Sequence, residues 1–363
     1  MSERARVRAV VYPRDANPYQ AQLYSAAAAS GMEIVYAGGH TRSHALNLLL
    51  LPLELLARRL SGWNVLHLHW TYAFGLYGSR RFPILYRFAS FWFVVVLATA
   101  RACGLRIVWT AHNVLPHERV FHDDVAAGLR LVSSSDLVIV HSPAAERELT
   151  ELFGRPSRVA MVPHPPFASR SMDREASSAG PLRLLFFGRI GSYKGVEDLL
   201  LAMHHLGPST ELRLTVAGAC EDRGLAARLS QLSRPLDGRV ALRLERVPEE
   251  DVPALLGEHD LLMLPFRRTT TSGSALLGLG AGMTVAVPDL PTFEGMPVLR
   301  FEPGVDGIVR FLESLAEMER EVLVRLGESG RAWAAAQSSW QEAGEATARM
   351  VGALLDDGNS SAA

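Results

Sequence analysis

Short apolar segments with the composition of β-strands alternate with longer helical patterns along the chain, and this alternation constrains the fold more than any other feature of the sequence. A strand followed by a helix and another strand forms a parallel pair, and helices then cover both faces of the sheet. In the first half of the chain, the expected strands are Arg6–Tyr12, Val65–His69, Arg106–Thr110, Leu137–His141 and Arg158–Val162. The sequence therefore predicts an α/β fold.

A second series of strands follows a break in this pattern. Residues 169–180 are polar, turn-rich and without periodicity, as in a linker between domains. The strands expected after it are Leu182–Phe187, Leu212–Ala217, Val240–Leu244, Leu261–Leu264 and Thr284–Val287. A chain of 363 residues suits two domains. We expect two Rossmann-like parallel-sheet domains facing a central cleft, at residues 1–168 and 181–340, followed by a C-terminal helix and frayed tail at 341–363.

Charge and cysteine content exclude several classes of protein. The formal net charge is -1, so nothing in the charge balance indicates a nucleic-acid-binding surface, and we expect no nucleic-acid partner. The two cysteines, Cys103 and Cys220, form no metal-binding pattern, which fits a reducing compartment. The N-terminus has no signal-peptide pattern, and the apolar run from Phe88 to Ala100 is shorter than the roughly 20 residues of a membrane span. We expect a cytoplasmic protein.

The strongest chemical signal is a glycine-rich loop after the first strand of the second domain. It reads Gly188-Arg189-Ile190-Gly191-Ser192-Tyr193-Lys194-Gly195 and precedes a helix. Glycines allow a tight turn at the carboxyl end of a strand, and the helix N-terminus behind them favours an anion. Arg189 and Lys194 add two cations that can neutralise a diphosphate. The alternative is an ordinary strand-to-helix turn with two solvated basic side chains.

This loop resembles the opening of the donor domain in glycosyltransferase family 4, whose members have the GT-B fold of two Rossmann-like domains. The resemblance continues in order through Leu214–Gly218, Arg246–Val252 and Asp260–Phe266, and covers most of the second domain. The residues that it implies for the donor are, at the diphosphate, Gly188, Arg189 and Lys194 and, at the nucleotide base, Arg246, Val247 and Pro248.

One part of the second domain departs from the family pattern. Many members carry a pair of glutamates that contact the donor sugar and ribose, whereas Thr269 and Leu277 stand at the corresponding positions here. The segment Thr271-Ser272-Gly273 instead resembles a subset of bacterial polysaccharide transferases that have Ser-Gly at this helix start. We expect its hydroxyls and free backbone N–H groups to bind the second phosphate. Simple N-capping of the helix is a compatible alternative.

Acceptor residues are expected in the first domain, on the loop after its first strand, because this loop faces the cleft in a GT-B enzyme. By position, the candidates are Asn17, Tyr19 and Gln20. Asp15 could serve as a catalytic base if the reaction inverts the anomeric centre, and an Asx-type turn ahead of Pro18 is the equally weighted alternative.

Histidines follow or end several strands of the first domain. His112 matches the histidine that family members carry after the equivalent strand and that contacts the donor sugar, so the resemblance implies a catalytic role for it. His69 lies near the carboxyl end of its strand and is a further acceptor-side candidate, whereas His67 is expected to pack inside. His141 and His164 are interpreted as structural. No histidine spacing indicates a metal site, and we expect neither a metal ion nor another cofactor.

The resemblance implies transfer of a sugar from a nucleoside diphosphate sugar to an acceptor hydroxyl, with retention and without metal. The acceptor is expected to be a glycan, a lipid-linked saccharide or a small molecule. Two alternatives stay open. One is a sugar-nucleotide epimerase of the same architecture, which needs no second substrate, and the other is a non-catalytic subunit that binds nucleotide sugars.

Two segments favour contact with a membrane. Residues 45–60 are leucine-rich and include two arginines near their end, and residues 80–101 combine six aromatic side chains with several arginines. Such segments can lie in the headgroup region of an anionic bilayer, which would place the protein at the inner membrane face. The alternative is that both segments are helices of the domain core.

Overall fold

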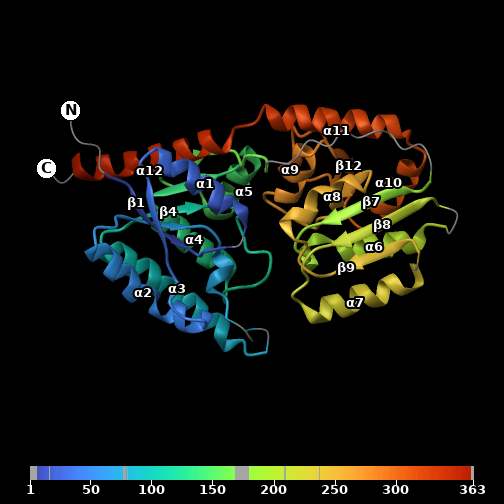
Figure 1. Cartoon of the computed structure of the whole chain (residues 1–363). Helices are drawn as coiled ribbons and strands as arrows, with labels where there is room; N and C mark the ends of the chain where they lie inside the picture. Colours follow the sequence, from blue (N-terminus) through green and yellow to red (C-terminus); the bar gives the residue numbers. More distant parts are fainter. Residues whose placement is uncertain are drawn as a thin grey trace. The chain divides into compact units, whose positions relative to one another are not determined.

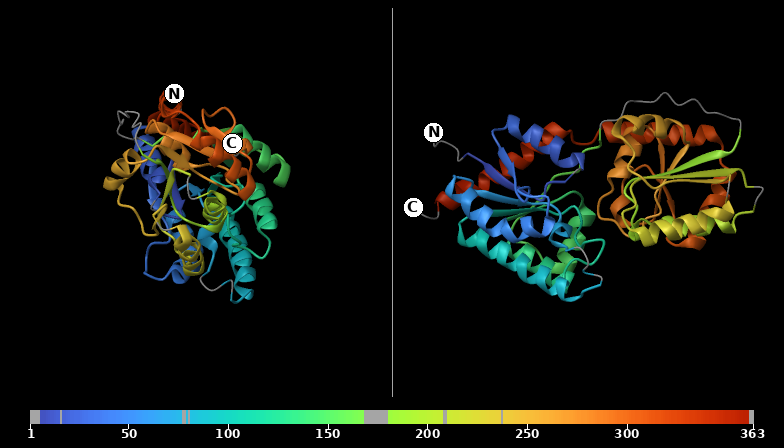
Figure 2. Two further views of the ribbon diagram at one scale, coloured as in Figure 1. Left: turned by 90° about the vertical axis from the view of Figure 1, so that its right-hand side faces the viewer. Right: turned by 60° about the horizontal axis from the view of Figure 1, so that its bottom comes forward.

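The computed structural model describes residues 6–15, 17–76, 79, 81–167, 180–207, 210–236 and 238–360. The chain divides into two compact units, one made of Met1–His164 with Ser338–Ala363 and the other of Pro165–Gln337. Each unit contains a six-stranded parallel sheet with helices on both faces (Figure 1, Figure 2). The predicted α/β class with two Rossmann-like parallel sheets is therefore confirmed. Of the expected linker 169–180, only Gly180 lies within the described residues.

The first unit contains every strand expected in that half of the chain and one more, β2. Its strands are β1 (Arg8–Tyr12), β2 (Glu33–Tyr36), β3 (Val65–Leu68), β4 (Arg106–Thr110), β5 (Leu137–Val140) and β6 (Val159–Met161). Its helices are α1 (Pro18–Ala29), α2 (His44–Leu60), η1 (Thr71–Phe74), α3 (Ile84–Ala102), α4 (Asp124–Ser134), α5 (Pro143–Phe153) and α12 (Trp340–Ser360).

The order of strands in this sheet is β2-β1-β3-β4-β5-β6. From β1 the chain passes outward to β2, then returns to β3 on the other side of β1 and continues outward in that direction. The order therefore reverses between β1 and β3. In doubly wound sheets, ligands bind at this reversal, outside the carboxyl ends of the strands. The loops that follow β1 and β3 therefore border the candidate site of this unit.

Helix α12 belongs to the first unit although it ends the chain. It packs on α1 so closely that a Cβ added at Gly344 would lie 2.6 Å from the Cβ of Ala26. Val351 and Leu354 are buried in the same core as Leu23 of α1. Helix α12 runs to Ser360, so it includes most of the segment 341–363 that was expected as a C-terminal helix and frayed tail.

The second unit likewise contains every expected strand and adds β12. Its strands are β7 (Leu182–Phe187), β8 (Leu212–Ala217), β9 (Val240–Arg243), β10 (Leu261–Met263), β11 (Thr284–Pro288) and β12 (Leu299–Phe301). Its helices are η2 (Ser192–Lys194), α6 (Val196–His205), α7 (Arg223–Ser233), η3 (Arg234–Leu236), η4 (Glu249–Asp251), α8 (Val252–Gly257), α9 (Gly273–Gly280), η5 (Pro291–Phe293), α10 (Val305–Ala316) and α11 (Arg320–Ala335).

The sheet of the second unit has the order β12-β11-β10-β7-β8-β9. The chain moves outward from β7 through β8 to β9, and then returns to β10 on the opposite side of β7. The reversal therefore lies between β7 and β10. The two loops that leave these strands at their carboxyl ends are the glycine-rich loop and the segment that leads into α9, so the topology brings together two segments that the sequence singled out.

Candidate active site

In the second unit, the glycine-rich loop packs directly on the segment that follows β10. Gly195 has φ +71°, and a Cβ at this position would lie 1.8 Å from the carbonyl oxygen of Pro265. Only glycine tolerates both that conformation and that contact. The amine of Lys194 lies 4.2 Å from the ring centroid of Phe266 and 5.1 Å from that of Tyr193, as cation–π pairs. The close backbone approach thus sets the position of the Lys194 amine.

Lys194 is the only lysine in the sequence, and its side chain is half-buried. Burial, and secondly the charge of Arg189, lower the pKa of Lys194 to about 8. At neutral pH the amine is still mainly an ammonium ion. Among the described residues no carboxylate forms an ion pair with it, so its charge is available to an anionic ligand.

The start of α9 borders the same loop. A Cβ added at Gly188, which has φ +134°, would lie 2.7 Å from the hydroxyl of Ser274 in the first turn of α9. Ser272 caps this helix, because its hydroxyl accepts a hydrogen bond of 3.2 Å from the backbone N–H of Ala275. The Thr271 hydroxyl is buried and has no hydrogen-bond partner within the described part of the chain. A buried hydroxyl without a partner is costly, and a phosphate oxygen at the helix N-terminus would supply one.

Arg189 lies at the rim of this site. Its guanidinium is exposed and forms an ion pair of 2.8 Å with Glu221, which is also exposed. An exposed pair of this kind contributes little free energy, so a diphosphate can compete with Glu221 for the guanidinium.

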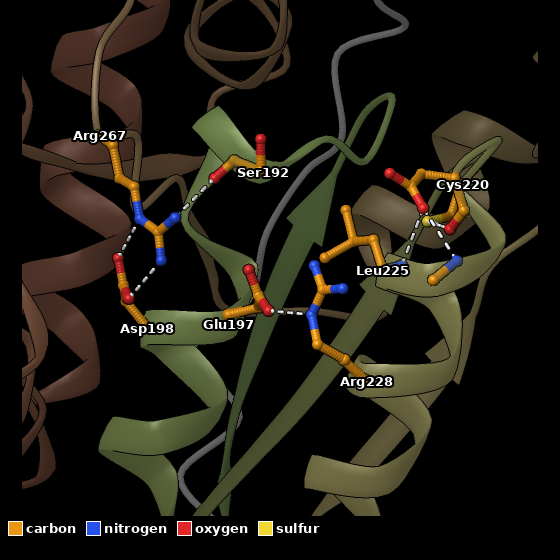
Figure 3. Close-up of polar contacts among 9 residues, drawn as sticks. Ser192, Glu197, Asp198, Cys220, Leu225, Arg228 and Arg267 are labelled. Carbon is orange, nitrogen blue, oxygen red and sulfur yellow. Dashed lines mark hydrogen bonds and ion pairs between the residues drawn. The ribbon is translucent and has the colours of Figure 1, made fainter. Parts of the chain in front are cut away.

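Two carboxylates in the first turn of α6 would repel a diphosphate, but both are paired with arginines (Figure 3). Asp198 accepts two hydrogen bonds of 2.7 Å from Arg267, and Glu197 accepts one of 2.9 Å from Arg228. Arg267 also donates from its side chain to the carbonyl of Ser192 at 3.3 Å, which ties the loop to the segment after β10. Sequence reasoning missed Arg267, although it directly follows Phe266 in the segment that was singled out.

The three residues expected at the nucleotide base line a hollow of about 680 Å³ beside β9. Arg246, Val247 and Pro248 follow the carboxyl end of β9, and Ser230 of α7 and Glu258 also line the hollow. The end next to Arg246–Pro248 is on the same edge of the sheet as the glycine-rich loop. That end is therefore where a base can be held.

In the first unit, the loops after β1 and β3 are joined by hydrogen bonds at Asp15. One of its carboxylate oxygens accepts from the backbone N–H of Asn17 at 2.7 Å, and the other accepts from the hydroxyl of Tyr72. The first bond is the Asx turn that the sequence offered as the alternative to a catalytic base. Asn17 in turn caps α1 by accepting from the N–H of Tyr19 at 3.0 Å. Asp15 thus has a structural role, and its role as a base stays a prediction.

Tyr19 and Gln20 are buried, each with 1% of its surface exposed. The amide of Gln20 donates to the carbonyl of Pro13 at 2.8 Å, and its oxygen accepts from the N–H of Asp15 at 3.0 Å. These bonds hold the loop from inside the unit. Of the three acceptor-side candidates on α1, Asn17 alone is exposed, so direct contact with an acceptor is expected chiefly from Asn17.

A set of buried polar side chains lies at the carboxyl ends of β3, β4 and β5, and we call it the histidine network: Tyr24, His67, His69, Thr110, His112 and His141. The Tyr24 hydroxyl lies 2.9 Å from His67 Nδ1 and 2.6 Å from His69 Nε2. His69 Nδ1 lies 2.9 Å from His112 Nε2. The structure therefore places His69 and His112, two predicted site residues, in direct contact.

The two ends of the network are the Thr110 hydroxyl and the bond of His141 to the Val162 carbonyl. His67 Nε2 lies 2.8 Å from the Thr110 hydroxyl at one end. At the other end His112 Nδ1 lies 3.2 Å from His141 Nε2, and His141 Nδ1 lies 2.8 Å from the carbonyl oxygen of Val162. The prediction that His67 packs inside the domain is confirmed, since none of its surface is exposed.

Burial favours the neutral form of every ring in the network. It lowers the pKa of His67 to about 3 and that of His141 to about 4, although the hydrogen bond of His141 to the Val162 carbonyl acts in the opposite direction. Burial, with the neighbouring histidines second, holds the pKa of His69 and His112 well below the usual value. His112 also stacks on Trp70, with ring centroids 4.5 Å apart. Sequence reasoning missed Tyr24, Thr110 and Trp70, although Trp70 adjoins His69 in the sequence.

Comparison with known proteins identifies a family model that matches part of the second unit, and relatives that match about three fifths of the chain. The model of the family described as glycosyl transferases group 1 matches residues 181–323, the part that holds the glycine-rich loop and α9. The GDP-mannose:glycolipid 4-beta-D-mannosyltransferase of Xanthomonas campestris pv. campestris is 27% identical over 230 residues, or 63% of this chain and 62% of that relative. The matched part thus spans about three fifths of the length of this curated relative.

Solved structures share the fold of the whole chain. Sucrose-phosphate synthase (tll1590) from Thermosynechococcus elongatus has a TM-score of 0.76 at 14% identity, covering 97% of this chain and 100% of that chain. Anabaena Alr3699/HepE in complex with UDP-glucose has a TM-score of 0.70 at 13% identity, covering 96% of this chain and 99% of that chain. At these identities the likeness shows the fold alone.

Proposed function

We propose that this chain, which has the GT-B fold and carries a group 1 glycosyltransferase domain at residues 181–323, transfers a sugar from a nucleoside diphosphate sugar to an acceptor hydroxyl. The observation that carries the proposal is the convergence in the second unit of the glycine-rich loop, the Lys194 amine and the start of α9. A diphosphate is the ligand that such a combination of one half-buried cation, one rim cation and a helix N-terminus fits best.

The proposed chemistry needs no metal ion. When the glycosidic bond to the phosphate breaks, negative charge grows on the departing diphosphate. Lys194 lies where it can stabilise that charge, Arg189 can swing from Glu221, and the Thr271 hydroxyl and the first N–H groups of α9 can donate hydrogen bonds. Because Asp198 and Glu197 are paired with arginines, no carboxylate at the start of α6 competes for these donors.

For the stereochemical outcome we propose retention. The departing phosphate oxygen would then take the proton of the acceptor hydroxyl on the same face of the sugar, and no protein nucleophile is required. Inversion would require a base such as Asp15, whose two carboxylate oxygens already accept hydrogen bonds. The anomeric configuration of the glycoside product, read by NMR and compared with that of the donor sugar, decides between the two.

A lipid-linked acceptor is the acceptor class that we propose, because of the outer surface of α2 and α3. Its exposed apolar side chains, which we call the α2–α3 face, are Leu46, Leu49, Leu53, Leu56 and Leu60 on α2 and Ile84, Phe91 and Val94 on α3. The leucines recur every three or four residues, so they form one stripe along α2. Leu60 is 81% exposed and Phe91 is 62% exposed. The two helices lie side by side, and Trp92 of α3 donates a hydrogen bond of 2.7 Å to the carbonyl of Leu48 in α2 (Figure 2).

The charges around the α2–α3 face suit an anionic lipid surface. Glu54, the only acidic residue of α2, is buried and accepts a hydrogen bond from the N–H of Gly38, and α3 contains no acidic residue. Arg59, Arg87 and Arg101 are exposed on the same two helices. Aliphatic and aromatic side chains can enter the headgroup boundary while arginines meet the phosphates of anionic lipids.

Helix α3 is the one helix of the described residues that is long and apolar enough to cross a membrane, with 19 residues. Phe93 and Val96 on its inner face are buried in the core of the first unit. We therefore propose that α3 does not span a bilayer, and that its outer face contacts the bilayer surface.

The test of the proposed function begins with the donor. A ligand that binds only the native state raises the apparent stability, so thermal unfolding with UDP, GDP, TDP and ADP identifies the nucleoside. The corresponding nucleotide sugar is then incubated with and without a glycolipid acceptor. A new glycoside that requires the acceptor supports the transferase. An altered sugar formed from the donor alone indicates the epimerase, and binding without any product in either incubation indicates the non-catalytic subunit.

A further inference from the structure

The position of each proton in the histidine network can be assigned, because one end of the network is a carbonyl oxygen, which only accepts hydrogen bonds. A carbonyl oxygen has no proton to donate, so His141 Nδ1 must carry the proton of its bond to Val162. A neutral His141 then has a lone pair on Nε2, and His112 must donate to it from Nδ1. By the same reasoning His112 Nε2 is an acceptor, and His69 donates to it from Nδ1.

The assignment continues without conflict to the other end. His69 Nε2 is left with a lone pair, so the Tyr24 hydroxyl donates its only proton there. The Tyr24 oxygen must then accept from His67 Nδ1, and His67 Nε2 accepts from the Thr110 hydroxyl. All four rings therefore carry their proton on Nδ1, which is the tautomer that an isolated histidine side chain populates less.

This assignment bears on what His112 can do. Both of its ring nitrogens are used inside the unit, and its ring is stacked on Trp70 and perpendicular to Tyr19, with centroids 4.5 Å away in each case. A second proton on His112 or on His141 would point one N–H at another, so the bonds also oppose a charged imidazolium at these two rings. The bonds therefore fix both the orientation and the neutral state of His112.

We propose that Tyr24, His67 and His69 are positioning residues that hold His112 as a neutral Nδ1–H imidazole in one orientation at the ligand edge of the first unit. The proposal rests on the proposed transferase function for its effect on turnover, but the proton arrangement does not depend on that function. In this proposal His112 influences turnover because its ring and backbone are held in one position. His67 and His69 influence turnover indirectly, because they hold His112 in that position. Tyr24 is the essential link, because its hydroxyl joins His67 to His69 by accepting from one ring and donating to the other.

The first measurement is a ¹H–¹⁵N spectrum of the imidazole groups of the full chain, with each network ring assigned among the 12 histidines by a His→Gln variant. We expect His67, His69, His112 and His141 all to carry their proton on Nδ1 and to stay neutral at pH 6. An Nε2–H tautomer, or a charged ring at that pH, in any of the four overturns the assignment.

The second measurement is the turnover of Tyr24→Phe, with Tyr36→Phe as the matched control. Tyr36 packs near Tyr24, with ring centroids 6.4 Å apart, but its hydroxyl is outside the network. We expect Tyr24→Phe to lower kcat about tenfold to hundredfold while KM for the donor is nearly unchanged, since small misplacements near reacting groups have effects of this size. Tyr36→Phe should keep kcat. Thr110→Val should lower kcat in the same way, and Thr110→Ser, which keeps the hydroxyl, should restore it.

A purely structural network would give a different result. It would lower the thermal midpoint of Tyr24→Phe and Thr110→Val but leave kcat unchanged well below that midpoint, and this outcome overturns the positioning role. His112→Ala serves as the reference, because the loss of kcat in Tyr24→Phe should not add to the loss in His112→Ala when the two are combined. If the unaltered protein turns over no donor at all, the proposed function fails, and the imidazole spectrum still decides the proton arrangement.

Discussion

Single residues determine where charge is available in the second unit. Lys194 places its amine on Phe266, and Gly195 makes this possible because any Cβ there would collide with the carbonyl of Pro265. The nearby carboxylates of Glu197 and Asp198 are paired with arginines that lie outside the loop. The charge of Lys194 thus remains for a ligand, while the neighbouring charges are used within the protein.

Replacement of Lys194 by alanine tests this arrangement. We expect Lys194→Ala to lower kcat by roughly 10² to 10³, or about 2.7–4 kcal/mol, because it removes a donor aimed at charge that develops as the diphosphate leaves. Arg189→Ala should act in the same direction but less strongly, since its guanidinium is exposed and shared with Glu221. Steady-state kinetics with the identified donor measure both effects.

Arg310→Ala is the matched control for Lys194→Ala. It also removes one cation of the second unit, but Arg310 lies on α10 and pairs with Glu302, and both side chains are exposed. Its kcat should stay within about twofold of the unaltered protein, as expected for an exposed ion pair. Equal kcat values for Lys194→Ala and Arg310→Ala would contradict the assignment of the diphosphate site.

At the scale of elements, α2 and α3 combine a buried face with an exposed apolar face. The buried side chains of Leu51 and Phe93 belong to the core of the first unit, whereas Leu53 and Phe91 point outward. The sequence showed that these segments are apolar and flanked by arginines, but periodicity alone could not decide between a core helix and a membrane-contacting one. The structure shows that one face of each helix is core, and the outer face stays a proposed membrane contact.

Charge placed on the α2–α3 face tests that contact. We expect Leu53→Glu combined with Phe91→Glu to abolish sedimentation with vesicles that contain phosphatidylglycerol, because carboxylates would enter an apolar and anionic boundary. Leu201→Glu is the control, since Leu201 is also exposed, at 37%, but lies on α6 of the other unit. Failure of the unaltered protein to sediment with anionic vesicles at low salt would favour a soluble acceptor.

The sequence predicted those parts of the fold and of the candidate site that are determined by a few consecutive residues. The glycine-rich loop, the strand before it and the cap at Ser272 each lie within a few consecutive residues, so the sequence alone indicated them. The pairing of Arg267 with Asp198 joins residues 69 positions apart, and Tyr24 meets His67 across 43 positions. Contacts of this range depend on strand order, which the alternation of strands and helices does not specify.

At the scale of the whole molecule, the chain forms two six-stranded parallel sheets. In each sheet the strand order reverses once, and each reversal creates an edge at which a ligand can bind. The last helix, α12, returns to the first unit and packs on α1, a placement for which the sequence carries no local signal. The first unit also holds the four neutral network histidines, so its stability should respond to pH in a defined direction.

The first unit should lose stability as the pH falls below about 6.5. Burial holds the pKa of the network histidines below that of an unfolded histidine, about 6.5, so below this pH the unfolded state binds more protons than the folded state. The contribution of the neutral rings to the free energy of unfolding is fully present above about pH 6.5. It is lost as the pH falls from about 6.5 to the pKa values of the rings in the folded state. Each ring contributes up to about 1.4 kcal/mol per pH unit in this window.

Tryptophan fluorescence can follow this unit, because Trp333 alone of the six tryptophans belongs to the second unit. Urea midpoints measured this way should fall from pH 7 to pH 5. A midpoint that stays constant or rises over that range would show that the rings are not held neutral in the folded state.

The most direct test of the donor site is the chemical labelling of Lys194. Because the chain has one lysine, an amine-selective reagent followed by mass spectrometry reports on Lys194 and on the α-amino group, which serves as an internal control. We predict that the labelling rate of Lys194 titrates near pH 8, and that the nucleoside diphosphate of the donor suppresses it without changing labelling of the α-amino group. Equal labelling of Lys194 in the absence and presence of UDP, GDP, TDP and ADP would contradict a donor diphosphate held at this loop.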